Sequence, residues 1–102
     1  MEMRRVVVTG LGALTPIGND VEQYWQSLVN GVSGAALITN FDASQAKTQF
    51  ACEVKGFDAT KFFDRKEVRK YDKFSQYGIV AADQAVADCG VDLEKLNKER
   101  AG

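Results

Sequence analysis

The chain opens on charged residues followed by a short β-branched run. Arg5 to Thr9 is this run, and Gly10 closes it. A short continuous apolar run of this kind predicts a strand buried in an α/β sheet. Residues 10–18 hold three glycines and the only proline of the chain. They therefore predict an irregular loop.

Two longer segments carry apolar residues at helical spacing. The first begins at a cap on Asn19 or Asp20, runs to about Asn30 and stops at Gly31. Its apolar positions are Val21, Tyr24, Trp25, Leu28 and Val29. The second runs from Tyr71 to Cys89 and ends at Gly90. Its stripe holds many small residues, which predicts close packing against another element, expected to be another helix. This stripe consists of Phe74, Gly78, Ala81, Ala82, Ala85, Val86 and Cys89.

Weaker patterns fill the space between and after these helices. Residues 35–38 and 50–54 predict short strands, and residues 40–49 predict a polar loop. Residues 58–67 predict one or two short helical turns, and 93–100 a final turn. A single parallel-type strand with two good helices leaves strand edges and faces uncovered, so we expect the chain to be incomplete.

Composition excludes several kinds of chemistry. The 102 residues are 45% apolar and 26% charged, and 13 Lys and Arg nearly cancel 14 Asp and Glu. There is no histidine, which excludes Ser-His-Asp or Cys-His catalysis within this chain. Cys52 and Cys89 are too few and too far apart for a disulfide scaffold or a metal site, and we expect reduced thiols. No signal peptide or membrane segment is evident, so we expect a soluble cytoplasmic protein.

The glycine loop has two interpretations on its own residues. Gly10 and Gly12 after a strand resemble a dinucleotide-binding turn, with Asp42 as the acid for the ribose. Against this, the third glycine of that motif would fall on Thr15, and Pro16 delays the next helix. In the other interpretation the glycines form a tight turn and let neighbouring backbone come close.

The motifs together resemble a known family. Residues 4–19, Arg-Arg-Val-Val-Val-Thr-Gly-Leu-Gly-Ala-Leu-Thr-Pro-Ile-Gly-Asn, are similar to the opening of β-ketoacyl-acyl carrier protein synthases, most closely the synthase II type. Gly31 to Gly34 matches the family's Gly-x-Ser-Gly, and Phe41-Asp42 its Phe-Asp. Residues 65–70 match Arg-Lys-Glu-x-Arg-Lys, and Gln76-Tyr77-Gly78 follow in order. The resemblance covers the whole chain.

This resemblance implies a fold and a reaction. The fold is the N-terminal part of a thiolase-like five-layer α/β/α/β/α arrangement, with one core strand, two main helices and an irregular insertion here. Residues 1–102 would form the N-terminal portion of the first thiolase-like half of a homodimeric acyltransferase of fatty-acid synthesis. Its reaction is decarboxylative Claisen condensation. The resemblance places the nucleophilic cysteine and both histidines after residue 102, so no catalytic residue, metal or cofactor is expected here, and the isolated chain should be inactive.

A basic cluster between residues 61 and 73 carries the partner prediction. Six basic and three acidic residues fall in this range. The simplest interpretation is a solvated helix face. Nucleic acid is poorly supported, because no aromatic stacking platform accompanies the charge. The resemblance implies docking of the acidic acyl carrier protein through Lys66, Arg69 and Lys70, with Arg65 a weaker candidate. A non-catalytic carrier-binding module and a nucleotide-binding domain built on the Gly10–Gly12 loop stay as alternatives.

Overall fold

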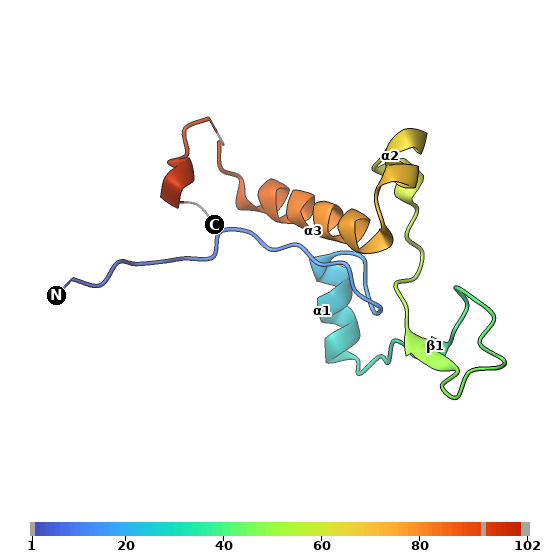
Figure 1. The fold of residues 1–102 in the computed structure, drawn as a ribbon. Helices are drawn as coiled ribbons and strands as arrows, with labels where there is room; N and C mark the ends of the chain where they lie inside the picture. Colours follow the sequence, from blue (N-terminus) through green and yellow to red (C-terminus); the bar gives the residue numbers. More distant parts are fainter. Residues whose placement is uncertain (1, 93, 101–102) are drawn as a thin grey trace.

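Three helices, two short strands and two single 3-10 turns make up the structure, a computed structural model that describes residues 2–92 and 94–100. Figure 1 shows the longest helix, α3, with α2 at one end and the loop before α1 running alongside it. The elements are α1 (Val21–Val29), β1 (Ala35–Leu37), β2 (Phe50–Cys52), η1 (Ala59–Lys61), α2 (Arg65–Lys70), α3 (Lys73–Cys89) and η2 (Lys98–Arg100). The predicted final turn is confirmed over η2, while Leu93 at its predicted start lies outside the described residues.

Helix α1 forms where its capping residues predict it. The Asp20 carboxylate accepts a hydrogen bond from the Gln23 N–H at 2.8 Å, which satisfies one of the free donors of the first turn. Gly31 adopts a φ of 67° just past the helix end, a conformation that favours glycine. Its predicted apolar stripe is only partly covered, since Trp25 is 61% exposed.

The two short predicted strands pair with each other. Strands β1 and β2 are antiparallel, with Ala35 opposite Cys52 and Leu37 opposite Phe50. Glu53 follows β2, and its carboxylate accepts hydrogen bonds from the backbone N–H groups of Thr39 (3.0 Å) and Asn40 (3.1 Å). These bonds, chiefly that from the Thr39 N–H, hold the pKa of Glu53 below its ordinary value, against a smaller opposing effect of burial.

The predicted core strand at Arg5–Thr9 is wrong for the described residues. This segment is assigned no strand, and Figure 1 shows it as an extended tube leading away from the helices. A strand needs a neighbour for its N–H and C=O groups, and the described residues place none beside it. Val6 is 90% exposed and Val8 79% exposed, so the β-branched side chains lack a partner as well.

Helix α3 begins later than predicted and packs against a different kind of element. Asp72 adopts an extended backbone as the N-cap residue, so the helix starts at Lys73 rather than Tyr71. Gly90, with a φ of 63°, ends it as predicted. Among the described residues the expected helix–helix contact of the small-residue stripe is wrong, because the extended glycine loop lies on part of this stripe instead.

Glycines 10 and 12 make this contact possible. A Cβ added to Gly12 would overlap the carbonyl oxygen of Ala81, and one added to Gly10 would overlap the carbonyl oxygen of Ala85. The backbone of the loop therefore touches the backbone of α3 directly. The other half of the predicted stripe stays open: Phe74 is 75% exposed, and nothing lies within 4 Å of a Cβ added to Gly78.

Few hydrophobic side chains are buried within the described residues. They are Ala43, Phe63 and Val80. The radius of gyration is 17.6 Å, whereas a compact domain of about 100 residues measures about 13 Å. Most apolar faces of the helices and of the hairpin are therefore open to solvent in this structure.

Candidate functional site

The short helix α2 gathers the predicted docking residues on one face. The Asp64 carboxylate caps it by accepting from the Glu67 N–H at 2.8 Å. Lys66, Arg69 and Lys70 follow at i, i+3 and i+4, a spacing that puts their side chains on the same face of a helix. All three are exposed, as is Arg65. The helix thus presents a compact cationic surface, which we call the α2 basic face (Lys66, Arg69 and Lys70).

Aromatic packing holds the inner side of this helix. Val68 is half-buried, in contrast to the exposed residues around it. The ring of Tyr71, which follows α2, meets the buried Phe63 ring edge-on at 5.9 Å between centroids. The Lys70 ammonium lies 5.6 Å from the Tyr71 ring centroid, a cation–π contact. The α2 basic face is therefore backed by apolar groups.

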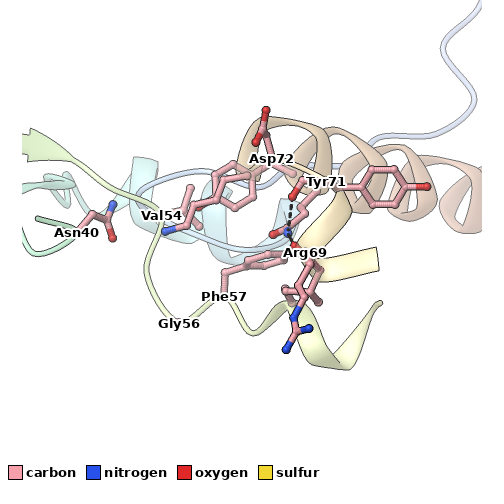
Figure 2. A pocket seen from close by; sticks show the side chains of 12 residues that line it. Asn40, Val54, Gly56, Phe57, Arg69, Tyr71 and Asp72 are labelled. Atoms are coloured by element: carbon pink, nitrogen blue, oxygen red, sulfur yellow. Dashed lines mark hydrogen bonds between the residues drawn. The ribbon is translucent and has the colours of Figure 1, made fainter. Parts of the chain in front are cut away.

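A buried glutamine ties α2 to α3. Gln76 is only 5% exposed, and its Nε2 donates to the carbonyl oxygens of Val68 (3.2 Å) and Tyr71 (3.1 Å). Figure 2 draws the pocket beside this junction, with the Arg69 guanidinium pointing away from the helices. Sequence reasoning missed this role, because a glutamine within a helix carries no signal for a contact with a different element.

A cavity of about 540 Å³ lies beneath the same junction. Phe57, Tyr71 and Tyr77 contribute aromatic walls, and Phe57 and Tyr77 meet edge-on at 5.1 Å between centroids. Arg69 and Lys73 bring positive charge to the lining and Asp72 brings negative charge. The cavity is continuous with the α2 basic face through Arg69.

Lys55 provides a contrast to the α2 basic face. Its Nζ donates to three backbone carbonyls, those of Gly34 (2.8 Å), Glu53 (3.0 Å) and Pro16 (3.2 Å). Asn19 in turn donates through Nδ2 to the carbonyl of Lys55 at 2.8 Å. This lysine joins the glycine loop to the hairpin and has a structural role. Its distant partners could not be predicted from sequence spacing.

Backbone N–H groups of the glycine loop donate hydrogen bonds to side chains of α3. The Leu11 N–H donates to the Asp88 carboxylate at 3.0 Å, and the Ala13 N–H donates to Oε1 of Gln84 at 3.0 Å. Gln84 also donates through Nε2 to the Asn19 carbonyl at 2.8 Å. A phosphate needs such N–H groups free and would be repelled by Asp88. The geometry therefore favours the structural interpretation of Gly10 and Gly12 over the dinucleotide one.

Neither cysteine lies in a reactive arrangement. Both are free, Cys52 exposed and Cys89 half-buried. The Cys89 Sγ donates to the Val86 carbonyl one turn earlier on its own helix, at 2.9 Å. Across residues 2–92 and 94–100, no group of three potential metal ligands comes together. Within the same residues, no helix is long and apolar enough to cross a membrane.

The fold and the sequence identify the class of protein. Residues 3–102 match the family described as β-ketoacyl synthase, N-terminal domain. The chain therefore belongs to the β-ketoacyl synthase family, and the family prediction from the sequence motifs is confirmed.

Within this family, the chain is similar to several proteins of the synthase 2 type. The chain is 48% identical over 102 residues to 3-oxoacyl-[acyl-carrier-protein] synthase 2 of Synechocystis sp., covering 100% of this chain and 24% of that protein. It is 43% identical over 99 residues to the synthase 2 of Staphylococcus aureus (strain COL), covering 97% and 24%. The chain thus spans about a quarter of the length of these curated relatives.

The chain is also similar to solved ketosynthase structures. The ishigamide ketosynthase/chain length factor matches with a TM-score of 0.80 and 38% identity, over 91% of this chain and 23% of that one. AntDE:AntF, described as a type II PKS acyl-carrier protein in complex with its ketosynthase bound to the hexaketide, matches with a TM-score of 0.65 and 30% identity, over 89% and 23%. The predicted fold class, an α/β portion of the thiolase-like ketosynthase fold, is confirmed.

Proposed function

We propose that residues 1–102 form the N-terminal portion of the first thiolase-like half of a 3-oxoacyl-[acyl carrier protein] synthase II. The support is the identity of 48% over the whole chain to a synthase 2. In this proposal the complete enzyme elongates fatty acids. The segment contributes structure and part of the docking surface for acyl carrier protein.

The proposed reaction is a decarboxylative Claisen condensation. A cysteine thiolate outside this segment takes the acyl group from its carrier thioester. Malonyl-acyl carrier protein then loses CO2, and the resulting carbanion attacks the acyl-cysteine carbonyl and expels the thiolate. Two histidines, also outside this segment, assist decarboxylation and stabilise the oxyanion. Cys52 and Cys89 take no part in this chemistry.

The α2 basic face is the observation that carries the docking role. Lys66, Arg69 and Lys70 share one exposed helical face, backed by the Phe63–Tyr71 contact. The carrier protein is acidic, so this face would steer it during approach and hold it through ion pairs at the rim of the contact. The solved AntDE:AntF complex of a related ketosynthase with an acyl-carrier protein supports a partner of this kind.

A homodimer and a cytoplasmic location complete the proposal. Both are expected from the resemblance to the family. The free state of Cys52 and Cys89 accords with a reducing compartment. The open apolar faces of α1 and α3 accord with burial against further parts of the enzyme or a second subunit.

Charge reversal in the complete synthase tests the docking role. Lys66→Glu with Arg69→Glu would place like charge against the acidic carrier and cost about 1–3 kcal/mol in association. We expect kcat/KM for carrier-linked substrate to fall about 5- to 150-fold. A small acyl thioester without carrier protein should react nearly as before, because the reacting groups lie elsewhere.

A matched control comes from the opposite end of α3. Lys95 and Lys98 are exposed. They belong to the segment that follows α3, which Figure 1 shows in red at the other end of this helix from α2. Lys95→Glu with Lys98→Glu changes the net charge equally and should leave carrier-linked kcat/KM within about twofold. Equal losses on both substrates would show damage to the fold, and no loss on either would show that the α2 basic face is merely solvated.

A further inference from the structure

The end of α2 depends on a donor from another helix. In a continuous helix, the Val68 carbonyl would accept from the N–H of residue 72. The chain instead becomes extended at Tyr71, with φ −97° and ψ 131°, and α2 stops at Lys70. The last carbonyls of a helix are left without backbone partners at such a break. Gln76 supplies the missing donor, since its Nε2 reaches both Val68 and Tyr71.

The burial of Gln76 makes these two hydrogen bonds consequential. At 5% exposure, water cannot readily replace either partner. Removing the amide would leave two carbonyl oxygens short of a donor in a partly buried place. A helix of six residues is also far too short to be stable by itself. The orientation of α2 therefore depends on its contacts with the rest of the chain, and this glutamine provides two hydrogen bonds at the end of the helix.

We infer that Gln76 is a positioning residue for carrier-protein docking. By fixing α2 against α3 it keeps Lys66, Arg69 and Lys70 projecting together, so that the carrier meets an ordered charged face. This inference rests on the proposed function. Ordering the face before contact lowers the entropic cost of binding, and a loose α2 would spread the same charges over many orientations. The charge would be unchanged while its effect on association became weaker.

Gln76→Met in the complete synthase tests this role. Methionine keeps the length and most of the bulk of glutamine but lacks both N–H donors. We expect KM for carrier-linked substrate to rise about 3- to 10-fold, with kcat within about twofold. The small acyl thioester should be used as before. Backbone amides of residues 65–71 should exchange with deuterium faster, because α2 opens more often.

Gln84 offers a matched control on the same helix. It is also a glutamine with two long-range hydrogen bonds, but its partners are Ala13 and Asn19 in the glycine loop. Gln84→Met should leave amide exchange in α2 unchanged and affect both substrates alike.

The outcomes separate this inference from the proposed function. If charge reversal at Lys66 and Arg69 leaves kcat/KM for carrier-linked substrate unchanged, the proposed docking role fails, whatever the effect of Gln76→Met. A second result is that the reversal acts as expected while Gln76→Met leaves KM for both substrates unchanged, or raises both equally. Such a result overturns the positioning role alone. Should Gln76→Met yield no soluble enzyme, Gln76→Asn, which is one methylene too short, must show the same split between substrates.

Discussion

The two halves of α3 make different kinds of contact with the rest of the chain. In its C-terminal half, the backbone of Ala81 meets Gly12 and that of Ala85 meets Gly10, with no room for a Cβ on either glycine. At its N-terminal end, Gln76 holds a short helix whose outer face is charged and open.

This difference shows how each end tolerates change. Backbone-to-backbone contact depends on residue size, so one methyl group is enough to disturb it. A charged rim depends on sign and orientation, so its residues can be exchanged with little effect on folding. The contact with Gly10 and Gly12 accordingly has a structural role. The α2 basic face, at the other end of α3, is where we propose that the carrier protein binds.

Separating the segment from the rest of the synthase should have the largest effect. The isolated 102-residue polypeptide should form no β-ketoacyl product, because the proposed nucleophile and histidines lie outside it. Its unfolding should be broad or accompanied by association, since so few apolar residues are buried. Product analysis and calorimetry at low protein concentration check both points. Product formation, or a sharp melt from a monomer, would contradict them.

The glycine contact should be the next most sensitive feature. Gly12→Ala in the complete synthase places a Cβ onto the Ala81 carbonyl and 2.9 Å from the Ala85 N. Overpacking of this kind costs about 1–3 kcal/mol, which chemical denaturation would measure. An unchanged denaturation midpoint would show that loop and helix do not touch in this way.

Gly78→Ala is the counterpart of this substitution on the open side of α3. Nothing described lies within 4 Å of the added Cβ, and alanine favours a helix by about 0.5–1 kcal/mol over glycine. We expect equal or higher helix content in the isolated chain, measured by circular dichroism. If the same change destabilises the complete synthase, a further element covers this face of α3 there.

Local patterns predicted much of the fold. The Asp20 cap, the Gly31 and Gly90 stops and both short strands follow from turn chemistry and periodicity, which act within a few residues. The segment Arg5–Thr9 failed as a strand because pairing depends on a neighbour that its own sequence does not contain.

The candidate site was predictable in one part only. The resemblance to the family singled out Lys66, Arg69 and Lys70, and their spacing puts them on one face of α2 in the structure. The hydrogen bonds of Gln76 and Lys55 were not predictable, because each joins elements whose approach is decided by tertiary packing. The small-residue stripe indicated close packing correctly but could not show that an extended loop, rather than a helix, lies on it.

The smallest expected effect is a loss of order in the β1–β2 hairpin when Glu53 is protonated at low pH. The pKa of Glu53 is lowered from an ordinary value of 4.5, mainly by the Thr39 N–H. Its contribution to hairpin order is therefore fully present above about pH 4.5 and is lost as the pH falls through the lower folded-state pKa. Relative to the intrinsic exchange rate at each pH, amide exchange at Thr39 and Asn40 should become faster on acidification.

Glu53→Gln supplies the control for this effect. The amide oxygen still accepts one bond but carries no charge and does not titrate in this range. Exchange at Thr39 and Asn40 should then be faster at neutral pH and independent of acidification between about pH 6 and 3, beyond the intrinsic pH dependence of exchange. A variant that kept the wild-type pH response would show that another group controls the hairpin.

The rate of association between the complete synthase and acyl carrier protein, followed across ionic strength, tests the central claim most directly. Steered association slows as salt screens exposed charges, over a Debye length of about 10 Å at 0.1 M. We expect Lys66→Glu with Arg69→Glu to slow association about tenfold or more at low salt and to flatten the salt dependence. The Lys95→Glu, Lys98→Glu control should keep the wild-type slope. Equal slopes for all three enzymes would contradict the assignment of the α2 basic face to carrier docking.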